Sequence, residues 1–269
     1  QFINPGLLGS YNFFKKEFIS PIEKGGDDVK KEQLRTMVSP FLLRRTKEQV
    51  AKDLPELDVR IYYSEMTSDQ KKLYEKEKSK ARNYLLENFD KSNFEYNRIV
   101  IQTLLRLRQL VNHPRLVFDD YEKESGKFKD VLEQWETVTK SNHKTLIFST
   151  FVKYLDLFKT HFTETENEFS WLTGGVTQKQ RAKEIEQFQT KDSVKSFLIS
   201  TKAGGTGLNL TAADYVFMLD PWWNPAAEKQ AIARAHRIGQ TKKVFALKFI
   251  TKDSIEEKIL KLQERKAAL

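Results

Sequence analysis

Apolar residues in the second half of the chain form five short runs, separated by longer stretches in which apolar and polar positions alternate as in helices. The runs are TLIFS (145–149), FSWL (169–172), SFLIS (196–200), YVFML (215–219) and VFALKFI (244–250). Helical patterns begin near residues 151, 178, 225 and 254. Strands that alternate with helices predict an α/β fold in which helices cover both faces of a parallel sheet.

The first half of the chain, from about residue 10 to 115, shows mainly helical patterns. One segment there, DVRIYYSEM (58–66), alternates well enough to predict a single strand. We therefore divide the chain into three predicted segments. These are a mainly helical region (1–115), an α/β lobe (116–252) and a final helix (253–269).

Hydroxyl residues, glycines or an acid follow four of the predicted strands directly. Parallel open sheets bind ligands at the carboxyl ends of their strands, so these loops are candidate binding sites. They are Ser149-Thr150, Thr173-Gly174-Gly175, the loop 200–207 and Asp220.

The loop STKAGGTG (200–207) is the strongest of these candidates. Its three glycines allow backbone N–H groups to surround an anion, while Ser200, Thr201 and Lys202 add hydroxyl donors and positive charge. The dinucleotide fingerprint G-x-G-x-x-G fails at Leu210, and the P-loop pattern occurs nowhere in the chain.

The segment QAIARAHRIGQ (230–240) places two arginines three residues apart. On a helix that begins at Asn224 and Pro225, Gln230, Arg234 and Arg237 would share one face. Neither arginine has an acid at a helical offset. Either an acid comes from elsewhere in the fold, or the anion is not part of this chain.

Charge and composition narrow the alternatives. Lysine and arginine outnumber aspartate and glutamate by 46 to 37, and the segments 98–115 and 229–248 contain no acid, which mildly favours a polyanionic partner. The absence of cysteine excludes disulfides and thiolate metal sites, and the four histidines are not spaced as metal ligands. No apolar run approaches the roughly 20 residues of a membrane span.

These motifs together resemble the second RecA-like lobe of the Swi/Snf family of DNA-translocating ATPases. The resemblance rests on SPFLLRRTKEQVAKDLPE, LRLRQLVNHP, SGK, KTLIFSTF, LTGGVTQKQR, STKAGGTGLNLTAADYVFMLDPWWNP and QAIARAHRIGQTKKV. One departure is LTGG, where the family commonly has an acid before the first glycine. Lobe one, with its P-loop lysine and DExH acids, is not found in the chain. We therefore expect half of an enzyme that is inactive alone.

The resemblance implies a role for each candidate residue. Arg234 and Arg237 would be catalytic arginine fingers that reach ATP in the cleft between two lobes. The ATP-binding residues would be Gly205, Gly207 and Gln230. The DNA-backbone contacts would be Ser149, Thr150, Gly174, Ser200, Thr201 and Lys202. We expect no metal ligand in this chain, because the Mg²⁺ ligands of the family lie on lobe one.

The expected function is thus ATP-driven translocation along double-stranded DNA that remodels protein–DNA complexes. Expected partners are duplex DNA, DNA-bound proteins and lobe one, with no membrane. The protein would act in the cytoplasm or nucleoid of a prokaryote, or in a nucleus. Two alternatives are a strand-separating RNA or DNA helicase and a basic module that binds nucleic acid without catalysis. The second leaves the two arginines unexplained.

Overall fold

The computed structural model describes residues 6–42, 51, 53–88, 93–204 and 207–267, and the chain divides into two compact units, Gln1–Asp53 and Leu54–Leu269. The first unit is helical. Its elements are α1 (Tyr11–Phe14), a π-helical turn η1 (Lys15–Ile19), α2 (Ser20–Gly25), α3 (Asp28–Val38) and a 3-10 turn η2 (Ser39–Phe41). Asp27 caps α3 by accepting a 3.0 Å hydrogen bond from the amide of Lys30.

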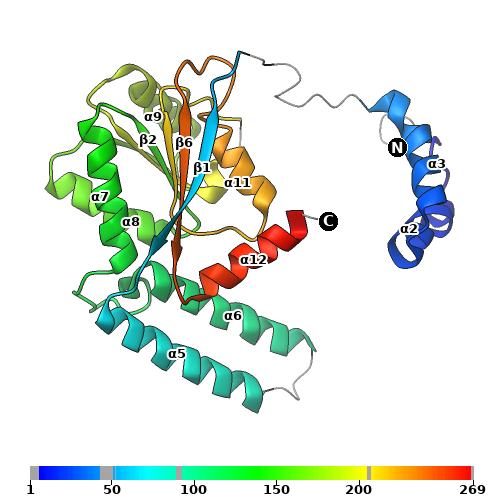
Figure 1. The fold of residues 1–269 in the computed structure, drawn as a ribbon, viewed down its shortest axis with the longest axis horizontal. Coiled ribbons are helices and arrows are strands. Elements are labelled where there is room, and N and C mark those ends of the chain that lie inside the picture. The colour runs from blue at the N-terminus through cyan, green and yellow to red at the C-terminus, as the bar shows by residue number, and fades with distance from the viewer. Residues whose placement is uncertain (1–5, 43–50, 52, 89–92, 205–206, 268–269) are drawn as a thin grey trace. The chain divides into compact units, whose positions relative to one another are not determined.

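The second unit is built on a parallel sheet of six strands in the order β1-β6-β5-β2-β4-β3 (Figure 1). The strands are β1 (Leu57–Ser64), β2 (Thr145–Ser149), β3 (Phe169–Leu172), β4 (Ser196–Ser200), β5 (Tyr215–Met218) and β6 (Val244–Thr251). All five apolar runs of the second half form strands within one residue of the predicted ends. The predicted α/β class with a parallel sheet is therefore confirmed.

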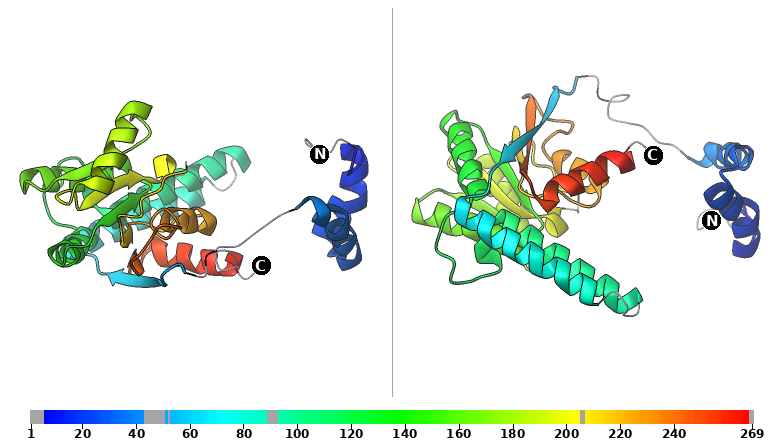
Figure 2. Two further views of the ribbon diagram at one scale, coloured as in Figure 1. Left: turned by 90° about the horizontal axis from the view of Figure 1, so that it is seen from above. Right: turned by 60° about the horizontal axis from the view of Figure 1, so that its bottom comes forward.

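Helices cover both faces of this sheet (Figures 1 and 2). The helices of the second unit are α5 (Ser68–Glu87), α6 (Asn93–Asn112), η3 (Pro114–Leu116), α7 (Gly126–Lys140), α8 (Val152–Glu164), α9 (Gln178–Thr190), α10 (Thr201–Gly204), α11 (Pro225–Ile232) and α12 (Ile255–Ala267). The four predicted helix starts, near 151, 178, 225 and 254, agree with α8, α9, α11 and α12.

Strand β2 shows how the sheet separates two hydrophobic cores. Leu146 and Phe148 pack into the core that α9 and α11 cover, while Ile147 between them packs into the core that α7 and α8 cover. Alternate residues of a strand point to opposite faces, so an all-apolar strand is stable only when both faces are covered. This explains why the sequence shows continuous apolar runs.

Strand β1 lies at the edge of the sheet, paired with β6 from Leu57↔Val244 to Ser64↔Thr251. The predicted strand at 58–66 thus belongs to the sheet and not to a separate helical region. The compact units divide after residue 53, whereas the predicted segments divide after residues 115 and 252. The difference arises because the strand pattern reveals no partner, and this partner comes from the other end of the chain.

Helices α5 and α6 form a long antiparallel pair beside the sheet (Figure 2). The buried Gln70 on α5 donates to the carbonyl oxygens of Leu110 and Val111 on α6, at 2.9 and 3.0 Å, and accepts a 3.2 Å bond from the amide of Gly126. A Cβ atom on Gly126 would lie 1.8 Å from the carbonyl oxygen of Glu65, so only glycine fits there. Within the described ranges, no helix is long and apolar enough to cross a bilayer.

Candidate functional site

The predicted binding loops meet at the carboxyl edge of the sheet. Strands β2 and β4 are neighbours whose last residues, Ser149 and Ser200, are register partners. Strand β5 pairs with the other side of β2, and its continuation reaches Asp220. Gly174 follows β3 at the far side of β4 and is exposed. Topology therefore brings the loops after β2, β4 and β5 side by side.

Asp220 holds the loop after β2 in place. Its carboxylate accepts hydrogen bonds from the hydroxyl of Ser149 at 2.6 Å, from the amide of Thr150 at 3.1 Å and from the Thr150 hydroxyl. Ser149 is fully buried and its oxygen also accepts a 3.0 Å bond from the amide of Phe151. Ser149 is therefore placed to shape the loop, while the exposed Thr150 forms its surface.

The loop after β4 begins with the short helix α10. Ser200 is buried, Lys202 is exposed, and the buried hydroxyl of Thr201 has no hydrogen-bond partner within the described part of the chain. A Cβ atom on Gly204 would lie 2.9 Å from the ring of Phe148, so the backbone packs closely on β2. Gly205, predicted to bind ATP, lies outside the described residues. Gly207 has a positive φ of 33° and is exposed.

The two arginines lie on a turn and not on the predicted helical face. Helix α11 ends at Ile232, so Gln230 remains on the helix, exposed, while Arg234 and Arg237 follow it. The expected shared face of these three residues was wrong.

The side chain of the buried Gln240 explains why the helix ends early. It donates to the carbonyl oxygens of Thr211, Ala213 and Ala235, at 3.1, 2.8 and 3.2 Å. The carbonyl of Arg234 accepts a 2.9 Å bond from the amide of Leu210. Tertiary hydrogen bonds thus satisfy backbone groups that a longer helix would have used.

Both arginine side chains contact the loop after β4. Nε of Arg234 donates to the carbonyl of Gly204 at 3.1 Å, and a terminal nitrogen of Arg237 donates to the carbonyl of Leu208 at 3.4 Å. Burial lowers the pKa of Arg234, and the neighbouring charges of Arg237 and Arg181 lower it further. Arg237 is exposed, and no described carboxylate lies within ion-pair distance of it. This cluster of positive charge suits an anion.

One residue at this edge, Arg108, was not assigned to the site from sequence. Arg108 appeared only as part of the acid-free segment 98–115, yet it is buried and donates to Asp220 at 3.2 Å and to the carbonyl of Pro221 at 2.8 Å. In the same segment Arg106 pairs with Glu77 at 2.8 Å, so the segment is not a uniform surface for a polyanion. The sequence did not indicate a role for Arg108 because the acid with which it pairs, Asp220, lies 112 residues away.

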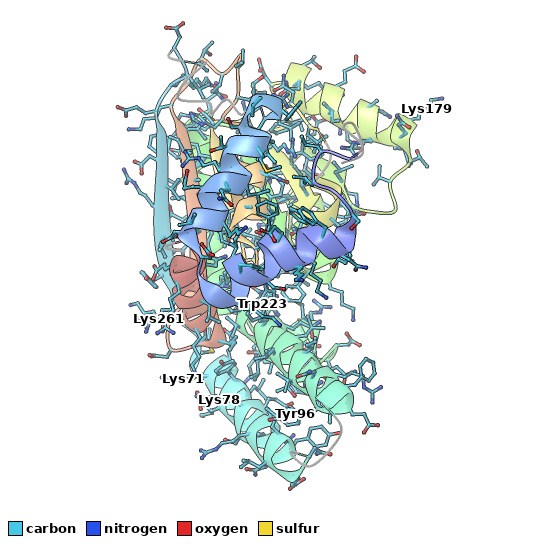
Figure 3. The ribbon with its side chains drawn as sticks, turned by 90° about the vertical axis from the view of Figure 1, so that its right-hand side faces the viewer. Lys71, Lys78, Tyr96, Lys179, Trp223 and Lys261 are labelled. Carbon is cyan, nitrogen blue, oxygen red and sulfur yellow. The ribbon has the colours of Figure 1, made fainter. Side chains whose placement is uncertain are left out.

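The tryptophan pair has divided roles. Trp222 is buried in the core between the sheet and α11. Trp223, which is labelled in Figure 3, is 42% exposed. The guanidinium of Arg108 lies 5.7 Å from its ring centroid. Among the described residues, no group of three or more His, Asp or Glu side chains could hold a metal ion.

Comparison with known proteins agrees with this architecture. Residues 1–116 match the SNF2-related domain, and residues 126–239 match the helicase conserved C-terminal domain. The structure of the Sulfolobus solfataricus SWI2/SNF2 ATPase core in complex with dsDNA is similar, with a TM-score of 0.69 and 37% identity over 98% of this chain and 56% of that chain.

Curated relatives are similar along the entire chain. The putative ATP-dependent helicase/translocase YwqA of Bacillus subtilis is 36% identical over 100% of this chain and 30% of its own length. The CHD3-type chromatin-remodeling factor PICKLE of Arabidopsis thaliana is 32% identical over 100% of this chain and 20% of its own. This chain therefore spans less than a third of either relative.

Proposed function

This chain belongs to the Swi/Snf family of helicase-like ATPases, and from that premise we propose that it forms part of an ATP-driven double-stranded-DNA translocase. In this proposal the chain supplies arginine fingers and contacts to the DNA backbone. The observation that carries it is the turn with Arg234 and Arg237, which sets two guanidinium groups against the loop after β4.

The arginine turn is suited to a phosphoryl group in transfer. A guanidinium is always charged and presents a planar fork of donors that matches phosphate oxygens. We propose that Arg234 and Arg237 stabilise negative charge on the γ-phosphate of ATP, and that Gly205, Gly207 and Gln230 contribute to ATP binding. The Mg²⁺ ligands are proposed to lie on lobe one of the enzyme, as the family resemblance implies.

DNA-backbone contact is proposed for the exposed residues of the carboxyl edge. Thr150, Lys202 and Gly174 are exposed there, and Thr201 has a buried hydroxyl without a partner among the described residues. Ser149 and Ser200 are buried, so we assign them to holding these loops in place. Contacts to phosphate fix position without reading sequence, which is what tracking along a duplex requires.

The proposed outcome of translocation is the remodelling of DNA-bound proteins. It is supported by the relative described as a chromatin-remodeling factor. Strand separation is the competing outcome, and a displaced-strand assay on a duplex with one labelled strand distinguishes the two. Release of a labelled strand would contradict the translocase proposal.

Replacing either arginine in the full-length protein tests the catalytic assignment. We expect Arg234→Ala and Arg237→Ala to lower kcat by about 10³–10⁵, because a finger acts on charge that develops in the transition state. The KM for ATP should change far less. Lysine should restore little, since it offers a point charge in place of a planar fork. Steady-state phosphate release with duplex DNA measures these constants.

Lys229→Ala is the matched control, since it removes an exposed positive charge from α11 next to the turn. It should leave kcat within about twofold of the parent, as a surface charge away from the phosphate contributes little. DNA affinity should survive in both arginine variants, because the proposed DNA contacts lie on other loops. Turnover within a fewfold of the parent in both alanine variants would show that these arginines are not fingers.

A further inference from the structure

Asp220 is an acid at the edge of the sheet where the proposed function places a polyanion. Its side chain is buried, and it orders the loop after β2 by accepting bonds from both hydroxyl groups and one amide of Ser149 and Thr150. An uncompensated carboxylate at this position would repel DNA phosphates, because electrostatic interactions are screened weakly away from bulk water.

Arg108 is placed to remove that charge. Its guanidinium donates to the Asp220 carboxylate at 3.2 Å, and its side chain is 6% exposed while that of Asp220 is 0% exposed. The guanidinium also lies 5.3 Å from the ring centroid of Phe151 and 5.7 Å from that of Trp223. Phe151 follows β2 and Trp223 follows β5, which is the neighbouring strand in the sheet. At 5–6% exposure, Arg108 is too deep to contact a phosphate itself.

We propose that Arg108 is a positioning residue for duplex binding: it neutralises Asp220, so that Asp220 can order the Ser149–Thr150 loop without presenting negative charge to the DNA backbone. The proposal rests on the proposed function of this edge as a DNA contact. It assigns an indirect electrostatic role to a buried arginine on α6, far in sequence from the loops that touch DNA.

A second buried ion pair provides an internal comparison. Nζ of Lys127 lies 2.5 and 2.6 Å from the carboxylate oxygens of Glu256, and both side chains are fully buried. Lys127 also donates to the carbonyl of Leu219 at 3.1 Å, the residue before Asp220. None of the hydrogen bonds of this pair within the described residues goes to Ser149 or Thr150. It should therefore stabilise the fold without controlling DNA affinity.

The experiment measures duplex affinity and melting temperature for Arg108→Met, Asp220→Asn and the double variant of the full-length protein. Arg108→Met should weaken duplex binding about tenfold or more, because it leaves a buried carboxylate unpaired beneath the DNA-facing loop. In the double variant, the added Asp220→Asn change should return the duplex affinity to within about threefold of the parent. Asparagine can still accept from Ser149 and Thr150 but carries no charge.

The control removes the other pair through Lys127→Met with Glu256→Gln. We expect a lower melting temperature with duplex affinity kept within about twofold. If Arg108→Met does not fold, Arg108→Lys carries the test. Lysine lacks the planar fork of arginine, but it keeps the positive charge that offsets Asp220, so duplex affinity should stay within about threefold of the parent. All affinities are referred to the folded fraction.

Three results would overturn the inference. The first is Arg108→Met with the parent's affinity. The second is a double variant that binds no better than Arg108→Met, which would make the role of Arg108 structural. The third is Arg108→Lys weakened by tenfold. A parent that binds no duplex at all would overturn the proposed function together with this inference, so the two failures are distinguishable.

Discussion

His113, in the segment that follows α6, is a buried residue whose neutral form the fold requires. Its Nδ1 accepts a 3.1 Å bond from the amide of Arg115, and the rings of Tyr121 and Phe128 pack edge-on against it. Burial, with a contribution from the charge of Arg115, lowers the pKa of His113 to about 4. The imidazole therefore stays uncharged in the folded state well below pH 6.5.

Stability should fall as the pH drops from about 6.5 toward 4, because the unfolded state takes up this proton first. The loss approaches about 3 kcal/mol at the lower limit, at roughly 1.36 kcal/mol per pKa unit. His113→Asn keeps an acceptor near Nδ1 and should flatten the dependence between pH 6.5 and 5 in urea unfolding. An identical pH slope in parent and His113→Asn would contradict the assignment.

The position of Asp220 could be predicted from the sequence, but its partner could not. Its position at the end of a predicted strand placed it correctly at the carboxyl edge. Its partner Arg108 could not be predicted, because nothing local joins two residues 112 positions apart. The family resemblance assigned Ser149, the last residue of β2, to DNA contact, but the sequence pattern does not show that its side chain is buried. Position in an element is predictable, but side-chain partners depend on tertiary packing.

At the scale of elements, helix α9 begins with a capping box. The hydroxyl of Thr177 accepts a 3.3 Å bond from the amide of Gln180, and the Gln180 side chain accepts a 3.3 Å bond from the amide of Thr177. This reciprocal pair satisfies two amides at the start of the helix. Helix α9 in turn places Phe188 in the core between the sheet and α11.

Thr177→Ala should lower the free energy of unfolding by about 1 kcal/mol, because the first turn loses its cap. Thr177→Ser should be close to neutral, since serine caps as well. Thr190→Ala, at the exposed last residue of the same helix, is the comparison and should change stability by less than about 0.5 kcal/mol. Urea midpoints at unchanged slope measure these differences. Equal effects at 177 and 190 would remove the cap as the cause.

The elements themselves were largely predictable, and their exceptions have tertiary causes. The continuous apolar runs predicted β2 to β6 because a strand buried on both faces must be apolar throughout. The end of α11 was missed because Gln240, eight residues beyond Ile232, ties the carbonyl of Ala235 in the turn to those of Thr211 and Ala213 before β5. The place of β1 was missed because the pattern of a strand does not reveal its neighbour.

The net charge of +9 and the proposed DNA contact at the carboxyl edge together predict salt-dependent binding to duplex DNA. Affinity should fall with salt by roughly 0.9 log units per log unit for each phosphate neutralised, with little preference between unrelated sequences. Lys202→Ala should reduce that slope by about one phosphate. The measurement is fluorescence anisotropy on two unrelated duplexes at several salt concentrations.

Lys140→Ala serves as the control for this slope. Lys140 is the last residue of α7, a few residues before β2 begins, so it lies at the opposite edge of the sheet from the carboxyl ends of the strands. Its ammonium group pairs with Glu136 at 2.9 Å. Its loss should leave the slope unchanged. A strong preference for one duplex, or a slope that responds equally to both lysines, would argue against the carboxyl edge as the DNA contact.

The pairing of β1 with β6 also affects how the chain folds during synthesis and which fragments of it keep a complete sheet. Glu56 precedes β1 and Lys243 precedes β6, and these two residues are 187 positions apart. The two ends of this long segment must therefore come together before the sheet is complete. Such closure carries an entropic cost that is repaid only late in folding. During synthesis β1 is made early and stays unpaired until β6 emerges, with Val59 and Ile61 open to intermolecular association. A segment cut to residues 126–239 would lack both strands and leave β5 as a bare edge.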